Sequence, residues 1–316
     1  MIDIELNLWL ERFNRDIGYK SSVIVFGNTS DIMLNPKNSG KFDSVINTII
    51  SYIRDRGYKQ IIKWDRVDGI DYSVSDDLID VSNQFVQSES PNDYDLGDYD
   101  LADNSNQNEY HYKAPDEFFP YMLNIMKNSS NKTAFVLDYS DYIFGNANSL
   151  SEKERDYLAT LGKVLETGQS YNMLDSNFAD IRNIVIIVAH NNAMIPPAFY
   201  LNNSMVGSVN IPLPGHKERE HFININSSCL NITQDIISDK TAKDDLIDAL
   251  DGFSLKEIAQ LMKLSRQISE KMSFEKLINL FKYGEKVSPW EELSKDKIER
   301  IEAVSYTHLR AHETGR

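Results

Sequence analysis

Two apolar segments of the sequence end in polar side chains that could bind a phosphate group or its metal ion. Residues 133–138 read TAFVLD and end at Asp138, and residues 183–191 read NIVIIVAHN and end at Asn191. A carboxylate such as Asp138 is a hard oxygen ligand of the kind that Mg²⁺ prefers. The amide of Asn191 can hydrogen-bond a phosphate oxygen or a water molecule. The simpler alternative for both residues is a cap or a turn at the end of a strand.

A third candidate segment follows the apolar residues 22–26. The chain continues there with small and polar residues: Gly27, Asn28, Thr29, Ser30 and Asp31. Their polar groups could donate hydrogen bonds to an anion at a helix N-terminus. The phosphate-binding pattern G-x-x-x-x-G-K-[ST] does not occur in the sequence, so the lysine that would clamp a phosphate is missing. A turn followed by a helix cap is the simpler explanation of this segment.

Other catalytic patterns give no better candidate. His190 and Asn192 flank Asn191 and could simply form a turn, and His216 and His221 are spaced differently from the histidines of an H-E-x-x-H zinc motif. No G-x-S-x-G elbow occurs either. The sequence patterns therefore give no support to a metallohydrolase or a serine hydrolase.

Composition excludes several classes of protein. The net charge of −15 argues against binding nucleic acid, which requires basic surface, and against docking on anionic membranes. No apolar run approaches the about 20 residues of a membrane span, and the acidic residues among the first residues argue against a secretory signal. The single cysteine, Cys229, excludes an internal disulfide framework and predicts a reducing, cytoplasmic location.

Strands and helices alternate in the first two thirds of the sequence, which predicts an α/β domain with a parallel sheet and crossover helices. The predicted strands lie at 22–26, 60–64, 133–138, 184–189 and 209–213. The predicted helices between and before them lie at 3–17, 42–53, 115–126 and 151–166. After about residue 231 only helices are expected, at 242–250, 254–267 and 274–282. The α/β domain is therefore expected to be followed by an all-helical one.

Two segments fit neither domain. Residues 86–112 are rich in Asp, Ser, Asn and Tyr, too polar to bury a core, so we expect a mobile acidic surface loop. Binding of a partner by this loop is the alternative. Residues 304–316 lack periodicity and resemble translated sequencing-adapter read-through, which would mean that the natural chain continues beyond about Ala303. The alternative is a frayed natural C-terminus.

In their order along the chain, these segments resemble the AAA+ ATPase family, a branch of the P-loop NTPases, over roughly residues 20–265. The resemblance rests on FVLDYSD, IVIIVAHNNAMIPPAF, VNIPLPGHKER and LDGFSLKEIAQLMKLSR. It implies a three-layer α/β core on a parallel sheet of about five strands, followed by a small helical lid. It also implies ATP with Mg²⁺ as cofactors, a homo-oligomeric ring and a protein client.

The resemblance divides the chain into an N-terminal helix (1–20), an AAA+-like domain (21–230), a helical lid and linker (231–303) and the tail (304–316). Carried over by position, Asp138 would be the carboxylate on the Mg²⁺ side and Asn191 the sensor of the γ-phosphate. Gly27, Asn28, Thr29 and Ser30 would occupy the place of the phosphate loop. Residues 277–293 resemble the linker that precedes the second module of bacterial, Clp-like, two-module ATPases.

The sequence departs from the family in three places. The Walker A loop is absent, and Tyr139 stands where the glutamate that polarises the attacking water is expected. A tyrosine phenol is a poor base at neutral pH; Asp141, three residues after Asp138, could replace it. The stretch 199–208 contains no arginine where the family's trans-acting finger is expected. Each departure removes charge from the site that stabilises phosphoryl transfer.

Three functions follow from these observations. The leading hypothesis is a degenerate AAA+ module that does not hydrolyse ATP and serves ring assembly or partner docking. The second is an active ATPase with an unorthodox phosphate loop at Gly27–Asp31, using Asp138 and Asn191. The third is a non-enzymatic scaffold whose acidic loop 86–112 binds a basic partner.

Overall fold

The computed structural model describes residues 8–38, 41–71, 112–128, 132–167 and 183–284. Contacts divide the chain into two compact units, Met1–Pro212 and Leu213–Arg316. The predicted acidic loop lies outside the described residues apart from Tyr112, and the tail 304–316 lies wholly outside them.

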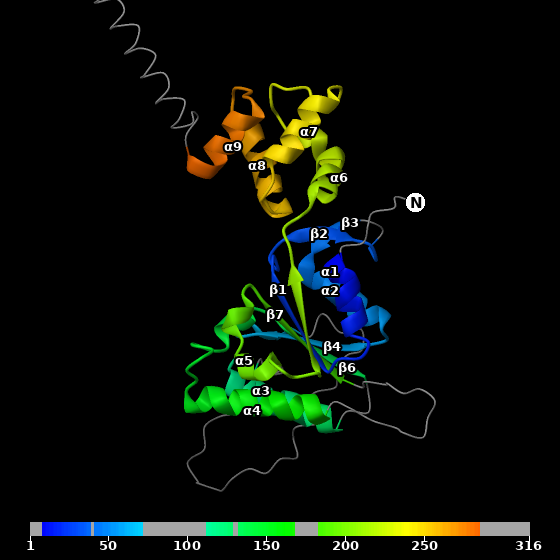
Figure 1. Ribbon diagram of the computed structural model, residues 1–316, viewed down its shortest axis with the longest axis vertical. Helices are drawn as coiled ribbons and strands as arrows, with labels where there is room; N and C mark the ends of the chain where they lie inside the picture. Colours follow the sequence, from blue (N-terminus) through cyan, green and yellow to red (C-terminus); the bar gives the residue numbers. More distant parts are fainter. Residues whose placement is uncertain (1–7, 39–40, 72–111, 129–131, 168–182, 285–316) are drawn as a thin grey trace, which may run out of the picture. The chain divides into compact units, whose positions relative to one another are not determined.

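The first unit is built on a six-stranded sheet with the order β5-β4-β6-β7-β1-β8 (Figure 1). Its five parallel strands are β1 (Ser22–Gly27), β4 (Gln60–Asp65), β6 (Thr133–Leu137), β7 (Asn183–Ala189) and β8 (Val206–Ile211). The short strand β5 (Gly69–Asp71) pairs antiparallel with β4 at one edge. The predicted α/β fold with a mostly parallel sheet and a helical C-terminal region is confirmed, and β5 is an addition that the sequence did not predict.

The central strand β7 is buried on both faces, as its continuous apolar sequence predicts. Successive side chains of a strand point to opposite faces, so Ile184 and Ile186 enter one hydrophobic core. Val185 and Ile187 enter the other core, on the opposite face. The sheet is therefore the middle layer of three.

Helices complete the two outer layers (Figure 1). Helices α1 (Leu8–Asp16) and α2 (Val45–Asp55) supply apolar residues to the first core. Helices α3 (Pro115–Asn128) and α4 (Glu152–Thr167) supply them to the second core. Within the second core the Trp64 ring stacks on Phe118 from α3, with ring centroids 4.5 Å apart, which fixes that helix against the sheet.

The strand order brings the carboxyl ends of β1, β6 and β7 together. Strand β1 lies between β7 and β8, whereas the next parallel strand along the chain, β4, lies on the far side of β6. After β1 the chain forms β4, β6 and β7 on one side of β1, and it then crosses to the other side to form β8. This reversal is a topological switch point. Ligands of open α/β sheets bind at such a point, outside the carboxyl ends of the strands.

The region between β1 and α2 differs from the prediction of a helix over residues 42–53. Strands β2 (Ile32–Asn35) and β3 (Lys41–Ser44) form an antiparallel pair there, and α2 begins only at Val45. Ser44 is the N-cap, because its hydroxyl accepts a hydrogen bond from the Asn47 backbone N–H at 3.1 Å. The apolar spacing of residues 42–53 concealed this boundary, since Phe42 falls in phase with the helix.

The second unit begins earlier than the predicted boundary at 230/231. It contains α6 (His216–Asn226), α7 (Lys240–Ala249), α8 (Leu255–Gln267) and α9 (Phe274–Tyr283). The buried Arg219 of α6 donates to the backbone oxygen of Ile247 at 3.1 Å and to the Asp251 carboxylate at 2.8 Å. These bonds tie α6 to α7, so α6 belongs with the helices that follow it.

None of the described helices is both long enough and apolar enough to cross a membrane.

A matched pair of leucine substitutions tests the second core. Leu161 on α4 is 1% exposed and Leu8 on α1 is 83% exposed. We expect Leu161→Ala to lower the free energy of unfolding by about 2–5 kcal/mol and Leu8→Ala to change it by less than about 0.5 kcal/mol. Urea unfolding followed by circular dichroism measures both, and equal effects would contradict the placement of α4 in the core.

Candidate functional site

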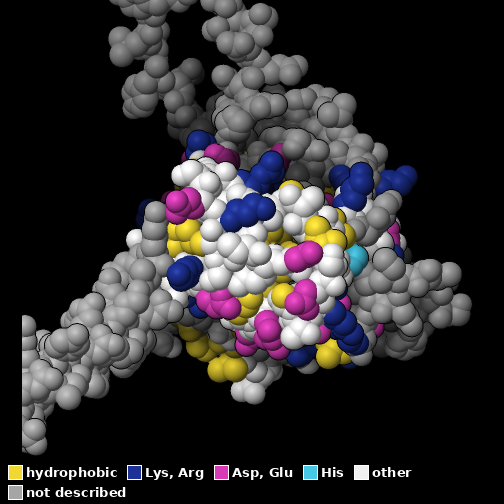
Figure 2. All heavy atoms as spheres, turned by 90° about the horizontal axis from the view of Figure 1, so that it is seen from above, with side chains coloured by type: hydrophobic (Ala, Val, Ile, Leu, Met, Phe, Trp, Pro, Cys, Tyr) yellow, Lys and Arg dark blue, Asp and Glu magenta, His cyan; other side chains and the backbone are white. Residues whose placement is uncertain are grey.

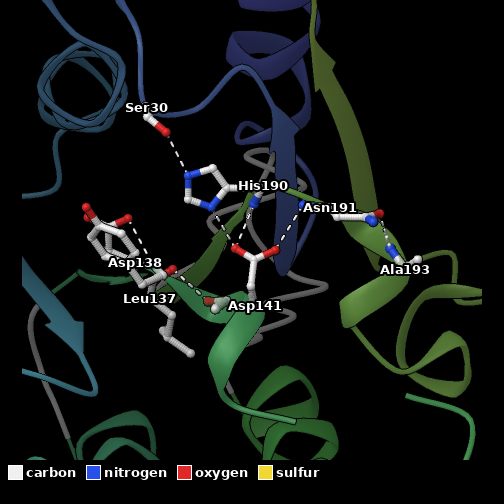
Figure 3. Close-up of polar contacts among 9 residues, drawn as sticks. Ser30, Leu137, Asp138, Asp141, His190, Asn191 and Ala193 are labelled. Atoms are coloured by element: carbon white, nitrogen blue, oxygen red, sulfur yellow. Dashed lines mark hydrogen bonds and ion pairs between the residues drawn. The ribbon is translucent and has the colours of Figure 1, made fainter. Parts of the chain in front are cut away.

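Three segments meet at the carboxyl edge of the sheet (Figure 3). One follows β1, the second is the turn after β6 with the short helix η3 (Ser140–Tyr142), and the third follows β7 and leads into η4 (Asn192–Met194). The predicted site residues Asp138, Asn191 and Gly27–Ser30 all lie on these segments. The structure therefore brings the predicted residues to one edge, although their side chains have different surroundings.

Asp138 lies at the end of β6, and its side chain is 17% exposed. Burial raises the pKa of its carboxyl. The hydrogen bond from the Tyr139 backbone N–H at 2.9 Å and the nearby Lys63 lower this pKa, but by less, so that the pKa is raised overall. The Lys63 ammonium lies 3.8 Å from the Asp138 carboxylate. Among the described residues no group of three His, Cys, Asp or Glu could hold a metal ion, so the Mg²⁺ role of Asp138 remains a prediction.

Asp141, on η3, is held more firmly. One of its oxygens accepts the His190 backbone N–H at 2.7 Å and the His190 ring Nδ1 at 2.9 Å, and the other accepts the Asn191 backbone N–H at 2.9 Å. Burial alone would raise the pKa of the Asp141 carboxyl, but these hydrogen bonds together outweigh it and lower the pKa. Asp141 therefore joins the end of β6 to the end of β7 as an ionised carboxylate.

Asn191 is the N-cap of η4. Its side-chain oxygen accepts a hydrogen bond from the Ala193 backbone N–H at 2.9 Å. Figure 3 shows this side chain directed toward Ala193 and away from Ser30. This is the capping alternative that the sequence offered for Asn191, while its role as a phosphate sensor remains a prediction.

His190 directs its imidazole toward the segment after β1, between Ser30 and Asp141 (Figure 3). The Ser30 hydroxyl oxygen lies 2.7 Å from Nε2 of His190, and Nδ1 of the same ring lies 2.9 Å from the Asp141 carboxylate. The chain Ser30–His190–Asp141 thus connects the ends of β1, β7 and β6. Sequence reasoning missed it, because the only signals were a histidine one residue after a strand and a serine in a turn.

The segment after β1 uses its polar groups within the protein. Gly27 has φ of +100°, and a Cβ there would lie 2.5 Å from the backbone oxygen of Ile211, so a glycine is needed. The Asn28 backbone N–H donates to that Ile211 oxygen at 3.0 Å, and the Thr29 N–H donates to the Gly27 oxygen at 2.7 Å. The Asn28 side chain donates to Asp31 at 2.7 Å. These donors are the ones that the sequence offered to a phosphate.

The N-terminus of α2 is occupied in the same way. The Val45 N–H donates to the Asp31 backbone oxygen at 3.3 Å, and Asn47 donates to the Ser44 hydroxyl. The Asp43 carboxylate accepts both the Ser44 N–H and the Asn47 side chain at 2.8 Å. A carboxylate at a helix N-terminus supplies the negative charge that the helix dipole favours. Two N–H groups in the first turn of this helix, those of Val45 and Asn47, are thus bonded to oxygen atoms of the protein.

Asp141→Asn tests the connection between β6 and β7. Because the folded-state pKa of Asp141 is lowered, its charge stabilises the fold above the unfolded pKa of about 3.9, and this stability is lost as the pH falls below that value. We expect the free energy of unfolding of the variant to be lower than that of the wild type by about 1–3 kcal/mol at pH 7 and by less at pH 3. Urea unfolding measures this difference. The exposed Asp156→Asn is the control. An equal loss at both pH values would exclude a charge effect.

Comparison with known proteins places these features in a family. The sequence model described as "AAA+ chaperone, N-terminal Rossmann-like domain" matches residues 4–212. Among solved structures, a crystal structure of the FIGL-1 AAA domain in complex with ADP matches with a TM-score of 0.42 and 11% identity. That match covers 92% of this chain and 83% of the other, at a similarity too low to support a function. No curated protein matches the chain. Because the family match covers most of the chain, this protein belongs to the AAA+ chaperone family, of which residues 4–212 form the N-terminal Rossmann-like domain.

Proposed function

We propose that this chain is a AAA+ module that does not hydrolyse ATP and that serves ring assembly or partner docking within a chaperone. The observation that carries the proposal is that donors at the phosphate-binding position are hydrogen-bonded within the protein. The N-terminus of α2 is bonded to Asp31, Asp43 and Ser44, where a P-loop ATPase would bind phosphate. A phosphate that approached these N–H groups would compete with the oxygen atoms already bonded to them.

Negative charge at the carboxyl edge of the sheet also opposes the binding of a phosphate. The carboxylates of Asp31 and Asp43 lie on the segment between β1 and α2, and Asp138 and Asp141 lie on the neighbouring turn. Like charges repel more strongly where water is partly excluded. The Lys63 ammonium lies beside the Asp138 carboxylate and partly neutralises its charge. The local field therefore disfavours a triphosphate.

The side chains that could act as the base for hydrolysis are also poorly suited to that role. Tyr139 follows Asp138 and is a poor base, while Asp141, its possible replacement, already accepts three hydrogen bonds. A general base must be able to reach and accept the proton of the attacking water. The arrangement supports a module without hydrolytic activity.

Family membership supports the remaining parts of the proposal. A domain of a AAA+ chaperone is suited to a homo-oligomeric ring and to a protein client, and we propose both for this chain. We propose a cytoplasmic location because the single cysteine leaves no internal disulfide to form. On the face drawn in Figure 2, acidic, basic and hydrophobic side chains of the described residues lie interspersed. This face offers no continuous basic area of the kind that nucleic acid requires.

Titration calorimetry of the full chain with Mg-ATP tests the proposal. We expect no saturable heat at millimolar nucleotide, which corresponds to binding weaker than about −4 kcal/mol. Saturable binding together with turnover of ATP would overturn the proposal.

The variant Asp138→Asn distinguishes the alternative, an active ATPase with an unorthodox phosphate loop. If the wild-type chain turned over ATP and this variant, folded by circular dichroism, did not, the alternative would stand. Turnover that is equal in both proteins would point to a contaminating ATPase.

Sedimentation velocity tests the proposed assembly. We expect the full chain to self-associate as its concentration rises and the sedimentation coefficient to be unchanged by Mg-ATP, because the module would not sense nucleotide. A chain that remains monomeric at every concentration would contradict ring assembly by this module alone.

A further inference from the structure

We propose that Ser30, His190 and Asp141 form a nucleophilic triad that can accept an acyl group from an ester. In this proposal Ser30 is the nucleophile, His190 the general base, and Asp141 a positioning residue that acts through His190. The proposal is independent of nucleotide binding, since none of its steps involves a phosphate.

The geometry meets the two requirements of an activated hydroxyl. A nucleophile and its base must lie within hydrogen-bond reach, and a third group must orient the base. The Ser30 Oγ to His190 Nε2 distance is 2.7 Å, and the His190 Nδ1 to Asp141 Oδ2 distance is 2.9 Å. The same ring therefore faces the hydroxyl with one nitrogen and the carboxylate with the other, as Figure 3 shows.

Asp141 also selects the tautomer of His190. An ionised carboxylate can only accept hydrogen bonds, so the proton of the neutral imidazole lies on Nδ1, and Nε2 is left to accept the proton of Ser30. Two backbone N–H groups hold the carboxylate in place. The turn beneath it is fixed by the buried Ser140, whose hydroxyl donates to the Leu137 oxygen at 2.9 Å. The base is thus oriented before any substrate arrives.

The triad is accessible from solvent. Ser30 is exposed, and the His190 side chain is 46% exposed. The Tyr139 ring, 51% exposed, lies with its centroid 6.0 Å from that of the imidazole and offers an apolar surface to an acyl chain. The groups lie at the carboxyl edge of a parallel sheet, where ligands of this architecture bind.

The proposed reaction has two balanced steps. In the first, Ser30 Oγ bonds to the ester carbonyl carbon while its proton passes to Nε2. The bond from that carbon to the leaving oxygen then breaks, and the alcohol leaves with the proton from Nε2. In the second, a water molecule attacks the acyl-serine in the same way, which releases the acid and restores the Ser30 hydroxyl. No oxidant, metal or cofactor is needed.

Three charged or titratable groups from the neighbouring elements act on His190: Asp141 on η3, Asp138 at the end of β6, and the Tyr139 phenol. The two carboxylates favour the imidazolium that forms when Ser30 gives up its proton. Reaction at Ser30 therefore depends both on the His190 ring and on the carboxylate that orients it.

A fluorophosphonate probe tests the proposal on the full chain. Attack by Ser30 forms an Oγ–P bond and expels fluoride, with the hydroxyl proton passing to His190. Mass spectrometry of the digested protein is expected to find the adduct on Ser30, and Ser30→Ala is expected to lose it. The control is Ser238→Ala. Ser238 is an exposed serine that is hydrogen-bonded to a carboxylate, Asp235, but is not part of the triad, and its loss should leave labelling unchanged.

His190→Gln separates catalysis from a structural role of the hydrogen bond. With the fold confirmed by circular dichroism, we expect labelling of Ser30 to slow by about 100-fold to 10,000-fold. Asp141→Asn is expected to lower the maximal rate of labelling without changing the probe concentration that gives half of that rate, because it removes the group that orients the base. Labelling at the wild-type rate in His190→Gln would overturn the proposal, as would the absence of an adduct on Ser30.

Hydrolysis of p-nitrophenyl acetate tests the acyl chemistry itself. Turnover by the wild type and by Ser238→Ala, together with its loss in Ser30→Ala, would support the triad. Equal turnover in Ser30→Ala would overturn it. Because these assays contain no nucleotide, a negative result would leave the proposal of a non-hydrolysing AAA+ module unaffected.

Discussion

The carboxylate of Asp141 is the interaction on which the carboxyl edge of the sheet depends. It lies on η3, after β6, and takes both backbone N–H groups at the end of β7 together with the His190 ring. Without it, the turn after β6 would lose its hydrogen bonds to the end of β7, and the imidazole would keep only its contact with Ser30. This one side chain thus contacts both His190 and Asn191, and through the imidazole it is linked to Ser30.

The hydrogen bonds at the carboxyl edge of the sheet also occupy groups that a phosphate would need. The Asn28 backbone N–H donates to Ile211, the Asn28 side chain and the Thr29 N–H donate within their own turn, and Ser44 accepts the Asn47 N–H in the first turn of α2. A phosphate loop works in the opposite way, because it leaves its N–H groups open for the ligand. The β2–β3 hairpin lies between β1 and α2, and its last residues, Asp43 and Ser44, supply acceptors at the start of α2.

The sequence predicted β6 and β7 to within one residue because their apolar runs are long and buried on both faces. The last strand was predicted at 209–213 but lies at Val206–Ile211, where the sequence is less apolar. It failed where pairing partners lie far apart or where one residue decides the outcome. The β2–β3 hairpin was missed because Lys41–Ser44 depends on pairing with Ile32–Asn35, which local periodicity does not record. Strand β7 ends at Ala189, and a shift of one residue reverses the side to which a strand residue points. Whether His190 or Asn191 faced Ser30 was therefore beyond the sequence alone.

The two edges of the sheet constrain how copies of this chain could associate. Strand β5 is only three residues long and contains Asp71, and short, charged edge strands resist pairing with strands of other chains. At the other edge, α1 packs against β8. The carboxylate of Asp16, on α1, lies so close to Gly207 of β8 that a Cβ added to this glycine would be 3.1 Å from it. Among the strands that the structure describes, β5 therefore resists the addition of a strand from another chain, and α1 lies against the outermost strand on the other side. A long and uncharged edge strand would instead favour aggregation by strand addition.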